Sequence, residues 1–242
     1  MLSTVLVVAM VACIAIMVAE QLRQHRRLRG EHEALLDEAE GVLENPVRGS
    51  DVAGLPVLSG IHGGRDVRLD VLIDSLALRK LPRLFLRGAV HRALAVPAPI
   101  FVQRPTVGSG MVEGAGRLDR ELPTPLGWPE ELVAWTTSDG PDRVPQSLYG
   151  VGNHFADPLT ASVLIAPRGL RVTLEVARGD VAAWRVSRGA RFGEPVSADV
   201  ADRLLTTAGE LADSLPAPRP RPAAPGVNGS RRGPGGPSPS SP

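Results

Sequence analysis

The stretch "DVRLDVLID" (residues 66–74) alternates apolar and polar side chains, which is the pattern of a β-strand with one buried face. Successive side chains of a strand point to opposite sides, so four aliphatic residues share the face that packs against a core: Val67, Leu69, Val71 and Ile73. The preceding "GIHGGR" (60–65) predicts a tight turn, because Gly63 and Gly64 can adopt positive φ. Together the two segments predict a strand that begins at a turn.

Strand patterns recur on the C-terminal side of this stretch. Three short segments are rich in β-branched, aromatic and aliphatic residues: "RLFLRGAVH" (83–91), "PIFVQR" (99–104) and "ELVAWTT" (131–137). "GLRVTLEVARGDVAAWRVSRG" (169–189) predicts a hairpin, in which "ARGD" connects the first strand to a return strand that carries Trp184. The Gly- and Pro-rich residues 108–130 predict a long surface loop.

Other segments carry helical signals. "VSADVADRLLTTAGELADSL" (196–215) places an apolar stripe at helical spacing after Ser197, the expected N-cap. "SLYGVGNHF" (147–155) is consistent with a short helix, and Asp157 followed by Pro158 predicts the start of another in "ADPLTASVL".

A further helix is expected between the N-terminal end of the chain and the strands. "EHEALLDEAEGVLE" (31–44) predicts a stalk helix that ends at "NPVRG", because Pro46 cannot continue a helix. Its apolar face can form a short dimer seam or dock onto its own domain.

The order of these elements predicts the fold class. Strand runs with flanking helices, but without regular strand–helix alternation, predict an α+β fold with one mixed or antiparallel sheet. We expect a single domain over residues 50–215 that ends in the amphipathic helix. Residues 216–242 contain nine prolines and one aliphatic side chain larger than alanine, so we expect a disordered tail.

The first residues of the chain predict a transmembrane helix at 2–19. These 18 residues carry no charge, and as a helix they extend about 27 Å, close to the ~30 Å hydrocarbon core of a bilayer. A cleaved signal peptide and a lipoprotein signal ending at Cys13 are the alternatives. Both lack the expected basic residues before the apolar run, which is also too long for a signal peptide. A retained single-pass anchor is therefore the preferred interpretation.

Basic residues follow the expected span and define its orientation. Within residues 20–44, a basic juxtamembrane and stalk segment, four arginines lie close to the membrane: Arg23, Arg26, Arg27 and Arg29. Positive charge next to a span favours the cytoplasmic side, so we expect the N-terminus outside and the domain in the cytoplasm. The simpler interpretation is that the arginines act only as this topology signal. The alternative is that they act as a lipid sensor.

Charge and motifs limit the function classes. The basic residues concentrate at the two ends, which leaves the body net acidic and argues against nucleic acid as a partner. The sequence contains no nucleophile elbow, phosphate loop or metal-binding histidine pair, so we predict no catalytic residues, no metal site and no cofactor. His154 is a possible general base near Asp157, although a local hydrogen-bonding role is the simpler interpretation.

Two segments carry a family resemblance: "GRDVRLDVLIDSLALRKLPRLFLRGAV" (64–90) and "APRGLRVTLEVARGDVAAWRVSRGARF" (166–192). They resemble bacterial membrane-anchored proteins of unknown function, and the resemblance covers most of residues 60–215. It implies a span of about 18–20 residues before one α+β domain, and it implies no activity.

These observations lead to three functional hypotheses. The first is a non-enzymatic interaction or scaffold domain held at the cytoplasmic membrane face, with the lipid bilayer and a membrane or cytoplasmic protein as partners. The second is a hydrolase-like enzyme at the membrane surface that uses the region of His154 and Asp157. The third is a sheet domain that binds a small ligand without chemistry.

Overall fold

The computed structural model describes residues 2–74, 81–105, 118–181, 184 and 190–218; within the first helix the side chains of residues 2–9, 11, 24 and 25 are not described. The helical elements are α1 (Leu2–Glu33), η1 (Ala34–Leu36), η2 (Glu38–Val42), η4 (Gln146–Ala156) and α3 (Ala198–Ser214). The strands are β1 (Glu44–Ser50), β2 (Pro56–His62), β3 (Arg65–Asp74), β4 (Arg83–His91), β5 (Ile100–Gln103), β6 (Arg120–Leu122), β7 (Val133–Thr136), β8 (Thr160–Ala166) and β9 (Gly169–Arg178).

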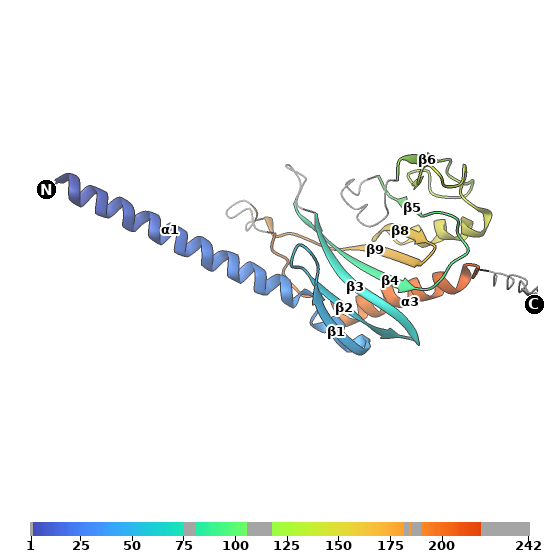
Figure 1. The fold of residues 1–242 in the computed structure, drawn as a ribbon, viewed down its shortest axis with the longest axis horizontal. Coiled ribbons are helices and arrows are strands. Elements are labelled where there is room, and N and C mark those ends of the chain that lie inside the picture. The colour runs from blue at the N-terminus through green and yellow to red at the C-terminus, as the bar shows by residue number, and fades with distance from the viewer. Residues whose placement is uncertain (1, 75–80, 106–117, 182–183, 185–189, 219–242) are drawn as a thin grey trace, which may run out of the picture.

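The described strands form one nine-stranded antiparallel sheet in the order β1-β2-β3-β4-β9-β8-β5-β7-β6 (Figure 1). The predicted α+β class with an antiparallel sheet is confirmed. The β2–β3 hairpin is closed by Gly63 and Gly64, both at positive φ, as the sequence predicts. The long pairings of β4 with β3 and β9 build the centre of the sheet, and the short strands β5, β7 and β6 extend it at one side.

Helix α3 covers the centre of one sheet face. Ser197 caps it by accepting a hydrogen bond from the N–H of Val200 at 3.4 Å, which confirms the predicted N-cap. The apolar stripe of α3 belongs to the main core together with the inward residues of β3, β4 and β9. On β4, Gly88 leaves room for Leu204, because a Cβ at that position would lie 2.9 Å from the Leu204 Cγ. The helix therefore packs directly against the backbone of the central strands.

The N-terminal helix α1 runs as one continuous element into the domain and projects away from it (Figure 1). Its C-terminal end is fixed by the segment that precedes α3. The His32 Nε2 lies 2.8 Å from the carbonyl oxygen of Ala190, and the Val196 N–H donates to the carbonyl of Leu35 at 2.9 Å. Leu35, Leu36 and Ala39 are buried in the core, so this segment docks onto its own domain.

The opposite face of the sheet contains a buried polar row across β3, β4, β9 and β8. Asp70 and Arg87 are direct cross-strand neighbours and form a hydrogen-bonded ion pair that is almost fully buried. Thr173 lies opposite Arg87, and Ser162 lies opposite Thr173. Both hydroxyl residues are buried as well. The sequence predicts the apolar face of β3 correctly, but it gives no sign that Asp70 is buried too.

We expect the substitution Asp70→Ala to lower the free energy of unfolding by about 3–5 kcal/mol, because it removes the buried carboxylate that forms an ion pair with the Arg87 guanidinium. The double variant Asp70→Leu, Arg87→Met should recover most of that loss, since well-packed apolar residues often replace a buried ion pair without cost. Urea unfolding of the three proteins measures both effects. Equal losses in the single and double variants would contradict this role of the pair.

Several sequence-based expectations are wrong in detail. Residues 34–42 form two 3₁₀ segments and not a continued α-helix. The segment "NPVRG" belongs to strand β1 at the edge of the sheet. Proline is tolerated in an edge strand, because its missing N–H can face away from the neighbouring strand. The helix expected after Asp157 is strand β8, which is buried on both faces of the sheet; Asp157 instead accepts the Leu159 N–H in a turn.

Two further expectations also change. Part of the predicted 108–130 loop is strand β6; residues 106–117 lie outside the described residues. In the predicted return strand, residues 181 and 184 are helical, whereas 182–183 and 185–189 lie outside the described residues. The antiparallel neighbours of β9 are instead β8 and β4. Residues 219–242 of the expected disordered tail also lie outside the described residues.

Within the part of the chain that the structure describes, no helix combines enough length and apolar character to cross a membrane. The span expected at 2–19 lies partly outside that description, because the side chains of residues 2–9 and 11 are not included in it.

Candidate functional site

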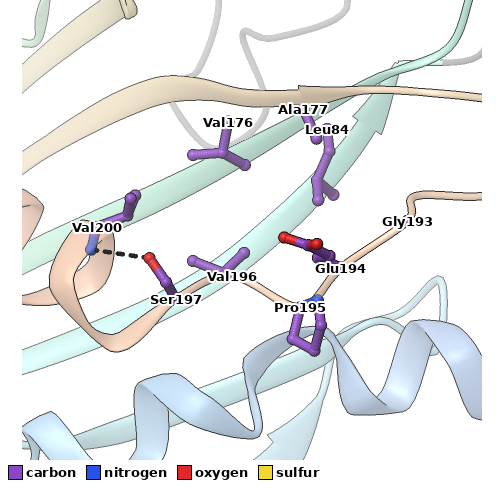
Figure 2. A pocket seen from close by; sticks show the side chains of 9 residues that line it. All are labelled: Leu84, Val176, Ala177, Gly193, Glu194, Pro195, Val196, Ser197 and Val200. Carbon is purple, nitrogen blue, oxygen red and sulfur yellow. Dashed lines mark hydrogen bonds between the residues drawn. The ribbon is translucent and has the colours of Figure 1, made fainter.

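An open hollow of about 460 Å³ lies between the ends of β4 and β9 and the segment that leads into α3 (Figure 2). Its walls are mainly aliphatic: Leu84, Val176, Ala177, Pro195, Val196 and Val200. Leu84 and Val196 are buried in the main core, and the partly buried Val176, Ala177 and Val200 pack against it, so the hollow lies at the edge of that core. We call it the β4–β9 hollow.

Two polar side chains line the β4–β9 hollow. Ser197 already accepts the Val200 N–H as the cap of α3. The carboxylate of Glu194 points toward Leu84 (Figure 2), and none of the described residues forms an ion pair with it. The hollow therefore combines an aliphatic lining with one negative charge.

A second, smaller hollow of about 240 Å³ contains the histidine that the sequence singles out. His154 and Asp157 both line it, together with other polar side chains and three aliphatic ones: Asn153, Thr160, Arg203, Thr207, Val172, Leu174 and Leu204. These residues come from η4, the turn after it, β8, β9 and α3. We call it the His154 hollow. The structure thus brings the two predicted residues into one concave site.

Burial lowers the pKa of His154, and the negative charge of Glu210 acts in the opposite direction. The imidazole is therefore neutral at pH 7. Asp157 uses its Oδ1 to accept the Leu159 N–H at 2.8 Å. In the described residues no hydrogen bond joins His154 to Asp157 or to a hydroxyl nucleophile, so the arrangement lacks the linked base and nucleophile of an activated-nucleophile site.

The predicted membrane-proximal arginines lie on the C-terminal half of α1. Arg23, Arg26, Arg27 and Arg29 are all exposed, and Arg23 lies 3.9 Å from the carboxylate of Glu20. Arg29 also lines a hollow of about 550 Å³ at the junction of α1 with β1 and β2. Within the described residues, no three His, Cys, Asp or Glu side chains lie close enough to hold a metal ion.

Comparison with known proteins adds one distant similarity. No protein-family model matches the chain, and no curated protein matches its sequence. The fold is similar to a solved structure described as the crystal structure of the mycobacterial trehalose monomycolate transport factor A, TtfA. The two are 12% identical with a TM-score of 0.45, and the match covers 80% of this chain and 99% of that chain. A likeness this distant assigns no function to the chain.

Two charged site residues are not found by sequence reasoning. Glu194 precedes Pro195 in a segment without periodicity, and Arg203 has the position of an ordinary solvent-facing residue on an amphipathic helix. Only the tertiary structure places Glu194 beside the β4–β9 hollow and Arg203 beside the His154 hollow. No local pattern distinguishes them from the other charged side chains of the chain.

Proposed function

We propose that the chain is a single-pass membrane protein whose α+β body is a non-enzymatic interaction or scaffold domain at the cytoplasmic face of the membrane. The observation that carries the proposal is the helix α1. Residues 2–19 contain no charge, and the helix continues without a break to Glu33. It projects alone from the domain (Figure 1).

The described side chains of this segment support an apolar environment. Ile14, Ile16, Met17 and Val18 point in different directions around the helix axis, and each of them is 48% to 68% exposed. A helix that is apolar on all sides is stable in a protein core or in a membrane. Because the domain does not cover this part of α1, a bilayer is the surrounding that fits it.

The arginines support the orientation. Arg23, Arg26, Arg27 and Arg29 follow the apolar segment directly. The bias of positive charge toward the cytoplasm then favours an external N-terminus and a cytoplasmic body. Each exposed arginine near the surface adds about 1 kcal/mol of attraction to anionic headgroups.

The junction of α1 with the body supports a scaffold role. Residues 20–33 extend the helix by about 21 Å beyond the apolar segment, at 1.5 Å per residue. The headgroup layer takes up only about 5–7 Å of that length. His32 at the end of α1 and Leu35 just after it are hydrogen-bonded to the segment before α3, which attaches the end of the helix to the body. The body would thus stand at a set height above the membrane, with its surface available to partners.

Reporter fusions after residue 215 test the orientation. We expect a reporter that is active only in the cytoplasm to be active, and one that is active only after export to be silent. Activity of the exported reporter alone would overturn the topology.

Site-specific photo-crosslinking tests the interaction role. A crosslinker at Glu194, beside the open β4–β9 hollow, is expected to give discrete protein adducts in intact membranes, whereas one at the exposed Asp66 of β3 serves as the matched control. Identical adduct patterns at both positions, or none at Glu194, would count against an interaction surface at the hollow.

A second candidate function is a sheet domain that binds a small ligand. The β4–β9 hollow favours it, because its volume falls within the 300–1,000 Å³ of typical ligand pockets and its lining is mainly apolar.

A further inference from the structure

The His154 hollow lies where η4 meets α3 and β9, on the same sheet face as the main core. Its floor is aliphatic and buried, formed by Val172, Leu174 and Leu204. Its rim is polar and comes from η4, the turn after it and α3. A ligand in this hollow would contact aliphatic groups below and hydrogen-bonding groups around its edge.

Two residues of opposite charge, Arg203 and Asp157, line this hollow, and both have free bonding capacity. Arg203 is exposed, and among the described residues no carboxylate pairs with it. Many other arginines of the body are held in ion pairs, for example Arg65 and Arg92 by Asp213. The Asp157 Oδ1 accepts the Leu159 N–H, which leaves Oδ2 without a hydrogen bond to any described residue. The rim therefore offers one cation and one anion.

The balance of charge selects the kind of ligand. With His154 neutral at pH 7, Arg203 and Asp157 cancel each other. Glu210 is close enough to influence the imidazole and adds negative charge on the α3 side, which disfavours a simple anion. A simple cation would in turn meet Arg203. A zwitterion with an aliphatic part satisfies both charges and the floor.

We propose that the His154 hollow binds a free aliphatic α-amino acid. Arg203 binds its carboxylate, Asp157 binds its ammonium group, and its side chain packs on Val172, Leu174 and Leu204. Asn153 and Thr207 supply further hydrogen bonds at the rim. Its volume of about 240 Å³ lies below the 300–1,000 Å³ of typical ligand pockets, so the hollow suits a small ligand such as an amino acid. The site is independent of the proposed membrane attachment.

Calorimetric titration of the full chain in detergent tests the ligand class. The probes are L-leucine, isovalerate, which keeps only the carboxylate, and isoamylamine, which keeps only the amine. We expect leucine to bind and each single-charge analogue to bind at least tenfold more weakly, because each analogue lacks one of the two charged groups that would pair with Arg203 and Asp157 at the rim. Absence of leucine binding at millimolar concentration overturns the proposal, and so does equal binding of an analogue.

Variants locate the site. Arg203→Ala and Asp157→Asn should each weaken leucine binding at least tenfold, and the asparagine keeps a carbonyl that can accept the Leu159 N–H. Arg143→Ala, at an exposed arginine that does not line the hollow, is the matched control and should bind leucine unchanged. If leucine binds equally well to the Arg203 and Asp157 variants, the hollow is not its site. Circular dichroism spectra of all variants separate loss of binding from loss of fold.

Discussion

Replacing Met10 and Ile14 by arginine in the full chain is expected to remove the protein from the membrane fraction. The two positions lie near the middle of the apolar segment 2–19. An arginine near the centre of a spanning helix costs about 2.5–3.5 kcal/mol on the insertion scale, so two cost about 5–7 kcal/mol. At 1.4 kcal/mol per factor of ten, that shifts the insertion equilibrium by about four orders of magnitude. Fractionation of membranes after a carbonate wash measures the result.

The control for this experiment is Met10→Leu with Ile14→Leu, which keeps the segment apolar and should leave the protein in the washed membranes. A double-arginine variant that stays there would show that the apolar segment is not the anchor. Release of both variants would point to attachment through the surface of the body.

The second large effect is expected where α3 packs on the sheet. Leu204→Ala should lower the free energy of unfolding by about 2–5 kcal/mol, because Leu204 is buried and its loss leaves a cavity. Gly88→Ala should cost about 1–3 kcal/mol, because the added Cβ would lie 2.9 Å from the Leu204 Cγ. The double variant should be less destabilised than the sum of the two, since the new methyl group occupies space that Leu204 leaves.

Thermal and urea unfolding measure this double-mutant cycle, in which coupling of contacting residues is usually 0.5–3 kcal/mol. Gly49→Ala on β1 is the control, because a Cβ there meets no atom within 4 Å and should change stability little. Strict additivity at Gly88 and Leu204 would contradict direct packing between β4 and α3.

The elements that could be predicted are those whose local pattern matches their surroundings. Strand β3 and helix α3 each bury one face, so their apolar side chains repeat with the period of the element. The segment 160–166 misled the sequence-based interpretation, because an Asp-Pro pair before an apolar run resembles a helix start. Buried on both sides, β8 has no alternating polar face that could have identified it as a strand.

Local sequence patterns predict the candidate sites even less completely than they predict the strands and helices. His154 and Asp157 could be singled out because they lie three residues apart in a polar cluster. Arg203 follows Asp157 by 46 positions and looks like any exposed helical residue, yet the structure places the two around one hollow. Likewise, Asp70 and Arg87 appear as surface charges in alternating strands, and their pairing depends on the register of β3 with β4.

The sequence by itself determined the apolar segment at 2–19, the arginines after it, the alternating strand at 66–74 and the amphipathic helix at 197–215. Each of these depends on side chains within a few residues of one another, so periodicity and charge reveal it. Only the tertiary structure decided the strand order, the buried Asp70–Arg87 pair and the meeting of Asp157 with Arg203. Those depend on which distant segments pack together, and a local pattern specifies that an element has a face to bury without specifying its partner.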